Sequence, residues 1–331
     1  MHLTFEKLTE LTKHLGGAIY RDAIPLTDWR IVDDLGYGTP LPPDDDPAWQ
    51  PLPAGGIWGS RLRWTWMKAA ATLPATFAGK PAALRLQFEP LRETPETEVF
   101  SPPEALVTVR GIDTPPQTID QIHHEILLAE SAPGARPLEI VLEMFAGSSQ
   151  AAGHRVRFRC ADLVWVDRAV EALYWDARVL LDTIAALPVH APERGALLRT
   201  LDDALAAIDW RNPPDAAFLA GVGAARDHLR ICVYETGSES DSRVPRPRIH
   251  ALGHAHIDVE WLWPLDVTRG KAERTFSTAL LLMDRFPGYT FTQSQPQLYQ
   301  LLAETRPDLY ERVKTRVREG RLNPTGATWV E

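Results

Sequence analysis

The chain of 331 residues is long enough for two or three domains. Its formal net charge of −9 offers no basic excess to meet phosphates, which argues against a nucleic-acid-binding protein. The apolar fraction of 44% is ordinary for a soluble globular protein, and no segment approaches the ~20 continuous apolar residues of a membrane span.

The start of the chain and the cysteines bear on the compartment. The first 17 residues have no apolar core region and no small-residue cleavage site, so a secretory signal is not expected. Only Cys160 and Cys232 are present, which makes no disulfide framework and no CxxC metal motif. They are expected to be reduced, buried thiols. We therefore predict a cytoplasmic protein.

Residues 1–20 are predicted to form an N-terminal helix. Phe5, Leu8, Leu11 and Leu15 follow the spacing of one helical face, and the pattern stops at two glycines. This helix must pack on another part of the protein.

Residues 21–167 are predicted to form an antiparallel β-sandwich with one face exposed to water. After a loop rich in Pro, Asp and Gly, apolar and polar residues alternate from about Arg61 onward, with turn residues between the runs. Trp64 and Trp66 lie in the first run. They could contact a sugar, but packing in the sandwich core is the favoured interpretation.

Residues 168–240 are predicted to form a helical connector. Three apolar helical faces are separated by prolines, and none carries a catalytic motif. A polar linker rich in Ser and Pro follows at residues 235–247, where we place the clearest domain boundary.

Residues 246–331 have the rhythm of an α/β domain. Strands are predicted at 249–253, 289–293 and 321–330, with helices at 267–285 and 297–319. Such alternation is typical of a parallel sheet, either open or closed into a barrel. A closed barrel needs ~250 residues, so we expect a truncated domain and a chain that is a fragment.

The run RIHALGHAHIDVEWLWP at residues 248–264 carries the candidate chemistry. His256 and Asp258 are two apart, so on an extended chain their side chains point to the same side. An imidazole beside a carboxylate suits a divalent metal such as zinc, and the indoles that follow suit a sugar ring. His254 could be a third ligand, but a hydrogen-bonded supporting histidine is the favoured interpretation.

Four ordered motifs resemble one family. They are GHAHIDxxWLWP, RTFST at 274–278, FTQSQPQLY at 291–299 and GRLNPTGATWVE at 320–331. Together they resemble glycoside hydrolase family 38, the α-mannosidases, in its cytosolic or vacuolar and bacterial branch. The sandwich resembles the family more loosely, through residues 111–113 and 124–126.

The resemblance implies a fold, an activity and a set of site residues. It implies an N-terminal β-sandwich and then the first part of a seven-stranded (β/α)7 barrel. His256 and Asp258 match the first two ligands of Zn²⁺, or of another divalent ion, and Trp261 matches an aromatic residue that packs against mannose. The implied activity is metal-dependent, retaining hydrolysis of terminal α-mannose from oligosaccharides.

The resemblance places the remaining catalytic groups beyond this sequence. The nucleophile would be an aspartate just after Glu331, so no catalytic residue is expected within the chain, which should be inactive alone. Glu260 departs from the family pattern, where a small residue is usual; it could perturb the site or form a local salt bridge. No nucleic acid or membrane partner is expected, and a homo-oligomer is left open.

Two other functions compete with this interpretation. One is a different metal-dependent hydrolase or deacetylase on a related barrel, which would need a pair of histidines four apart on a helix. The HxxxH pair here, His250 with His254, lies in a predicted strand. The other is a non-catalytic carbohydrate-binding module in which the sandwich binds the sugar.

Overall fold

The computed structural model describes residues 2–92, 94, 97–151, 153–235, 249–326 and 328–330. The chain divides into two compact units, each built from two separate stretches of sequence. One unit comprises residues 1–23 and 164–248, and the other comprises residues 24–163 and 249–331. The predicted N-terminal helix and helical connector therefore belong to one unit, and the sandwich shares the other with the C-terminal region.

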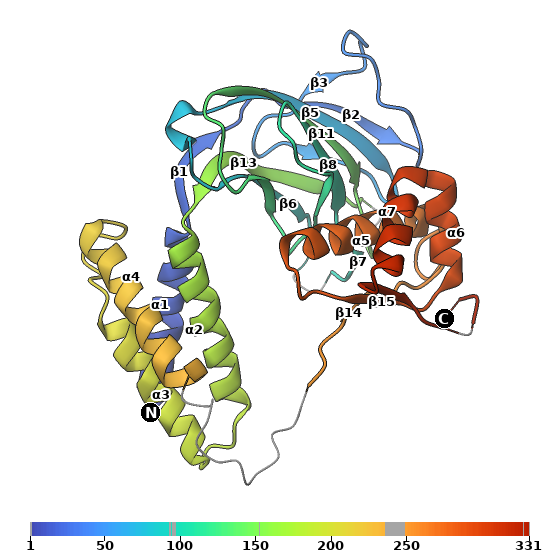
Figure 1. Ribbon diagram of the computed structural model, residues 1–331. Helices are drawn as coiled ribbons and strands as arrows, with labels where there is room; N and C mark the ends of the chain where they lie inside the picture. Colours follow the sequence, from blue (N-terminus) through green and yellow to red (C-terminus); the bar gives the residue numbers. More distant parts are fainter. Residues whose placement is uncertain are drawn as a thin grey trace. The chain divides into compact units, whose positions relative to one another are not determined.

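The first unit is helical (Figure 1). Its α-helices are α1 (His2–Ala18), α2 (Arg168–Ala186), α3 (Pro192–Ala206) and α4 (Ala216–Leu229), followed by a π-helical turn, η2 (Arg230–Glu235). Asp167 caps α2 by accepting hydrogen bonds from two backbone N–H groups, and Asp215 caps α4 in the same way with one. Leu8 and Leu15 of α1 are fully buried, and α1 packs on α2 and α3. The helix predicted from their spacing is thus confirmed.

Two antiparallel sheets form the first part of the second unit, except that residues 20–23 of β1 and 164–166 of β13 are counted with the helical unit. One has the order β1-β13-β6-β10, with β4 also paired to β13, and the other has the order β3-β2-β5-β11-β8-β9. A short pair, β12-β7, and a 3₁₀ turn, η1 (Ala75–Phe77), complete this part. The strands are β1 (Tyr20–Pro25), β2 (Arg30–Leu35), β3 (Gln50–Pro51), β4 (Ile57–Trp58), β5 (Trp64–Leu73), β6 (Ala82–Pro90), β7 (Val99–Ser101), β8 (Glu104–Arg110), β9 (Gln117–Ile119), β10 (Glu125–Ala129), β11 (Arg136–Phe145), β12 (Ser148–Ser149) and β13 (Val156–Val166).

Aromatic side chains fill the core around β13. Phe158 stacks on Phe88 at 5.3 Å and meets the edge of Trp29 at 5.6 Å between ring centroids. Trp58 packs edge-on against Phe88, at 5.8 Å. These large rings are buried. The prediction that Trp64 and Trp66 pack in the sandwich core is not confirmed, since Trp66 is only partly buried and donates its indole N–H to the backbone oxygen of Thr39 at 2.8 Å.

The prediction that one sandwich face is exposed to water is wrong for the six-stranded sheet. Helix α5 (Leu265–Arg285) covers the outer face of β5, β11, β8 and β9 (Figure 1). Trp64 of β5 packs there with Phe145 and with Val267 of α5, so its indole lies between sheet and helix, not between the two sheets. The alternating pattern cannot reveal this cover, because the helix follows more than a hundred residues later.

The C-terminal region is a three-stranded parallel sheet with helices between the strands. The strands are β14 (Gly253–His254), β15 (Phe291–Gln293) and β16 (Leu322–Pro324), in that order, and the helices after α5 are α6 (Pro296–Thr305) and α7 (Pro307–Arg318). Gly253 pairs with Phe291, and Phe291 pairs with Leu322. The predicted α/β alternation is confirmed, while the described strands form an open sheet.

Several details of the predicted elements need correction. The first strand is shorter and later than 249–253, because Ile249 and Leu252 are 86% and 63% exposed and make no ladder. The helix predicted over 297–319 is two helices, since Pro307 lacks the N–H group that would continue α6. Cys232 is exposed and Cys160 is partly exposed, so the prediction of buried thiols is wrong. The linker assigned to 235–247 lies outside the described residues beyond Glu235.

Candidate metal centre

In the segment that follows β14, successive side chains point to opposite sides. Ile257 is buried and packs in a cluster with residues of α5 such as Phe276, whereas His256 and Asp258 on either side of it point outward. The side chains of His256 and Asp258 are 54% and 46% exposed. Their spacing of two therefore places both groups on one side of the segment, as predicted.

The distance between the two groups fits two ligands of a single ion. Nε2 of His256 lies 3.1 Å from Oδ1 of Asp258. Ligands bound to one tetrahedral zinc ion at about 2.0–2.1 Å lie roughly 3.3 Å apart, so a small movement would convert the hydrogen-bonded pair into two metal ligands. Among the described residues, no group of three or more His, Cys, Asp or Glu side chains could hold a metal ion. The pair thus offers two donors of the kinds that zinc binds, and no third His, Cys, Asp or Glu joins it among the described residues.

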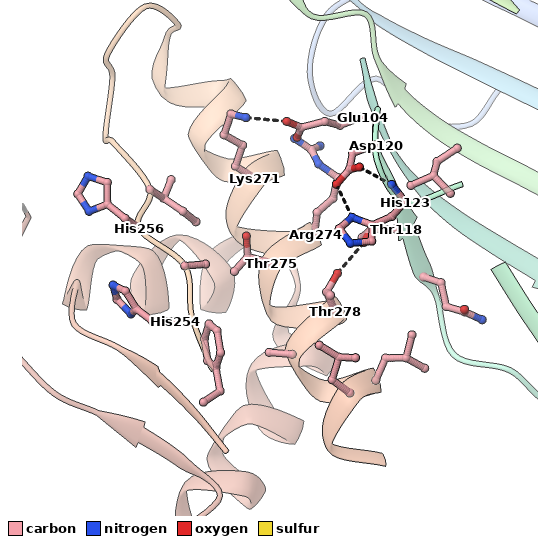
Figure 2. A pocket seen from close by; sticks show the side chains of 18 of the residues that line it. Glu104, Thr118, Asp120, His123, His254, His256, Lys271, Arg274, Thr275 and Thr278 are labelled. Carbon is pink, nitrogen blue, oxygen red and sulfur yellow. Dashed lines mark hydrogen bonds and ion pairs between the residues drawn. The ribbon is translucent and has the colours of Figure 1, made fainter. Parts of the chain in front are cut away.

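His254 is not brought into this pair. Its ring atom Nδ1 is hydrogen-bonded to the backbone oxygen of Thr292 in β15, at 2.9 Å. The ring therefore links β14 to the neighbouring strand. Figure 2 shows His254 and His256 as separate side chains on the same segment.

Trp261 presents an exposed ring close to the pair in sequence. Its side chain is 58% exposed, and its ring centroid lies 5.5 Å from that of Trp263 at an angle of 85°. Trp263 is held by a hydrogen bond from its indole N–H to Oγ1 of Thr268, at 3.1 Å, and by Lys271, whose Nζ lies 4.8 Å from the ring. The fixed Trp263 ring supports Trp261, which leaves an aromatic face open to solvent.

Glu260 has a local structural role. It adopts a φ of 56°, a left-handed conformation that is uncommon outside glycine. Its carboxylate accepts a hydrogen bond from the backbone N–H of Leu265, the first residue of α5, at 3.2 Å. A negative charge at a helix N-terminus is favourable, so Glu260 stabilises the start of α5. This hydrogen bond differs from the local salt bridge considered from sequence, and a perturbation of the site by Glu260 stays a prediction.

A cavity of about 520 Å³ lies beside the pair, between the segment after β14, helix α5 and the strands β9 and β10 (Figure 2). The sandwich contributes Thr118, Asp120 and His123 to its lining. Burial would raise the pKa of Asp120, but hydrogen bonds from His123 and from the Ile122 backbone N–H hold that pKa at about 2. Sequence reasoning missed this wall, because these residues lie more than a hundred positions before the pair and carry no motif of their own.

Glu104 closes one end of the cavity with two cations of α5. Its carboxylate accepts hydrogen bonds from Lys271 at 2.7 Å and from Arg274 at 2.5 Å (Figure 2). Burial would raise the pKa of Glu104, but the two cations outweigh it and keep the pKa below its usual value. Both cations are therefore paired with a carboxylate of the six-stranded sheet.

Comparison with known proteins assigns the segment that carries the pair. Residues 246–331 match the glycosyl hydrolases family 38 N-terminal domain. This segment belongs to glycoside hydrolase family 38. The family 38 segment thus begins just before β14, includes His256, Asp258 and Trp261, and continues through β16.

The relatives are α-mannosidases by name. Alpha-mannosidase G of Dictyostelium discoideum is 52% identical over 84 residues, which is 25% of this chain and 8% of that protein. Alpha-mannosidase of Saccharomyces cerevisiae is 27% identical over 92% of this chain and 29% of its own length. The chain therefore spans less than a third of these relatives, and its similarity to the yeast protein extends well outside the family 38 segment.

Among solved structures, TmCBM61 in complex with β-1,4-galactotriose is similar to 33% of this chain, with 65% of that chain covered. The identity is 9% and the TM-score is 0.18, so this similarity carries no argument about fold or ligand. Across the described residues, none of the helices has both the length and the apolar character that a bilayer span requires.

Proposed function

We propose that this chain is the N-terminal part of a zinc-dependent α-mannosidase, in which His256 and Asp258 are the first two metal ligands and Trp261 packs against mannose. The observation that carries the proposal is the 3.1 Å distance between the two candidate ligands on a segment of family 38. The exposure of both groups supports it, because a substrate and further ligands could reach them.

The chemistry of the substrate matches these groups. Mannose has an axial 2-hydroxyl, so its 2- and 3-hydroxyls are cis and can bind one cation together, which would select mannose over glucose. When bound, zinc would act as a Lewis acid toward these hydroxyls. His256 would donate a neutral nitrogen and Asp258 an ionised oxygen, and the open ring of Trp261 would cover an apolar face of the sugar.

The nucleophile and the acid of the proposed hydrolysis rest on the resemblance alone. Retention needs two carboxyl groups about 5 Å apart, one as nucleophile and one as acid. The resemblance puts the nucleophile just after Glu331 and the acid later still, on a closed (β/α)7 barrel. The substrate would be an oligosaccharide with terminal α-mannose, and the resemblance to the cytosolic or vacuolar branch favours the cytoplasm.

Zinc titration of the purified chain tests the metal pair. We expect one weak site by isothermal titration calorimetry, with an affinity at least ten times lower after His256→Ala or Asp258→Ala, since each change removes half of the donors. His123→Ala is the matched control, because His123 also forms an exposed pair with an aspartate, at 2.9 Å from Asp120. Equal losses of zinc affinity in all three variants, or no loss in any of them, would reject the assignment of His256 and Asp258 as metal ligands.

An activity assay separates this proposal from its competitors. We expect the chain alone to release no product from an aryl α-mannoside, with or without zinc. Metal-dependent turnover by the chain alone would show that its hydrolytic groups lie within it. Saturable mannose binding that survives His256→Ala and a chelator would favour a carbohydrate-binding module.

A further inference from the structure

The backbone ladder that holds the ligand segment stops before the ligands begin. Strand β14 pairs with β15 at two positions, Gly253 with Phe291 and His254 with Thr292. Residues 255–264, all of them described, belong to no strand. His256 and Asp258 thus lie on a segment that leaves the sheet, and its position must be held by other contacts.

Gln293 supplies one of these contacts at the point where the ladder ends. Its Nε2 donates a hydrogen bond to the backbone oxygen of Ala255 at 2.7 Å, and its Oε1 accepts one from the backbone N–H of Ser294 at 2.8 Å. The residue is 0% exposed, so both bonds lie away from water. A buried amide whose oxygen and nitrogen are both hydrogen-bonded is rigid, because breaking either bond leaves a buried polar group without a partner.

The bond to Ala255 acts directly on the geometry of the pair. Ala255 precedes His256, and Ile257 anchors the other side of His256 in the apolar cluster of α5. His256 is therefore fixed from both sides, by a polar bond before it and by an apolar anchor after it. Loss of the Gln293 bond would free the backbone at Ala255 and allow His256 to turn away from Asp258.

We propose that Gln293 is a positioning residue that holds His256 and Asp258 in the geometry of two ligands of one metal ion. This role rests on the proposed function of the pair as zinc ligands. Gln293 touches neither the metal nor the sugar, and it acts through the backbone of the ligand segment.

The chain offers a matched control for a purely structural role. Gln117 on β9 is 3% exposed, and its amide bridges to the backbone of Leu127, donating to its oxygen at 2.6 Å and accepting from its N–H at 2.9 Å. Like Gln293, it is a buried amide bonded to the backbone, but both of these bonds join β9 to β10 within the sandwich wall of the cavity and do not involve the ligand segment. Gln→Met at either position keeps the length of the side chain and removes its hydrogen bonds.

The experiment compares zinc affinity and thermal stability in the whole chain. We expect Gln293→Met and Gln117→Met to lower Tm similarly, while Gln293→Met alone weakens zinc binding, by about tenfold, as loss of a supporting contact does in other metal sites. Unchanged affinity in Gln293→Met, together with loss of binding in His256→Ala, would overturn the positioning role and leave the proposed function intact. A native chain without zinc affinity would reject the proposed function and the positioning role with it.

A second measurement uses the unaltered protein, in case Gln293→Met does not fold. In ¹H–¹⁵N spectra, zinc should shift the side-chain amide signals of Gln293 and leave those of Gln117 in place. If the Gln293 amide does not respond while the His256 ring signals do, the positioning role is overturned.

Discussion

Glu143 is a partly buried carboxyl on β11, between the six-stranded sheet and the C-terminal helices. The charged groups that act on it are Glu273 and Arg274 of α5 and Arg306 at the junction between α6 and α7. Burial and the Glu273 carboxylate raise the pKa of Glu143 to about 7, although the two arginines act in the opposite direction. Glu143 therefore titrates near neutral pH.

The raised pKa makes stability depend on pH in a defined direction. The unfolded chain ionises at its ordinary value of 4.5 while the folded protein keeps the proton, so the free energy of unfolding falls as the pH rises from 4.5 to about 7. Glu143→Gln should raise this free energy, by about 2 kcal/mol more at pH 8 than at pH 5.5. Urea unfolding at both pH values measures it. Glu139, on the same strand, has a side chain that is 42% exposed, so Glu139→Gln should change the free energy of unfolding equally at the two pH values. An equal change at the two pH values for Glu143→Gln would contradict the prediction.

The residues of the candidate site differ in how far the sequence could predict them. A spacing of two was enough to place His256 beside Asp258, because alternation is a local property of extended chain. The bond from Gln293 to Ala255 spans 38 residues and depends on the direction of one side-chain amide, which no local pattern encodes. The role of Glu260 likewise depends on where α5 begins, and the sequence pattern placed that start two residues too late.

At the scale of elements, the close approach of α5 to the sheet depends on Gly270. A Cβ atom at this position would lie 2.4 Å from the Trp64 ring, well inside contact distance. Glycine within a helix costs about 1 kcal/mol relative to alanine, so its presence here reflects packing and not helix propensity.

Gly270→Ala should therefore destabilise the protein. We expect a loss of about 1–3 kcal/mol in the free energy of unfolding, because the overpacking cost exceeds the gain in helix propensity. Gly223→Ala in α4 is the matched control: nothing lies within 4 Å of the added methyl, so it should stabilise by up to ~1 kcal/mol. Denaturant unfolding of both variants gives the answer, and a gain in both would refute close packing of α5.

The order of the C-terminal elements was predictable from sequence, but their ends were not. Apolar periodicity marked the strands and helices in the right sequence. The first strand begins later than predicted, because Ile249 and Leu252 have the apolar pattern of a buried strand but are exposed. The long predicted helix is divided in two, because Pro307 interrupts the hydrogen bonding of an otherwise continuous apolar face. Both errors arise where a tertiary partner or a single backbone group overrides the pattern.

For the molecule as a whole, the sandwich and the family 38 segment form one compact unit. Glu104 of β8 joins them through Lys271 and Arg274 of α5, with its side chain 15% exposed. Thr118 of β9 and Thr278 of α5 add a hydrogen bond at 2.6 Å. Sequence alone could not predict this union, because a domain boundary was placed between the two parts.

Removing the charge of Glu104 should weaken this union. Glu104→Gln leaves two cations without their carboxylate in a largely buried place, and we expect a loss of about 3 kcal/mol in the free energy of unfolding. Glu139→Gln, which breaks an exposed pair with Arg110 on the same sheet, should cost less than ~1 kcal/mol. Urea unfolding followed by tryptophan fluorescence and by circular dichroism tests both, and equal costs would argue against a buried link.

The division of each unit between two stretches of sequence has a consequence for synthesis on the ribosome. Helix α1 is made before α2 and α3, yet Leu8 and Leu15 are buried and α1 packs on these two helices, which follow more than 140 residues later. The outer face of the six-stranded sheet is likewise covered only once α5 has been made. Until α5 has been made, nascent chains therefore expose apolar surface that the folded protein buries, and surface of this kind is prone to aggregation.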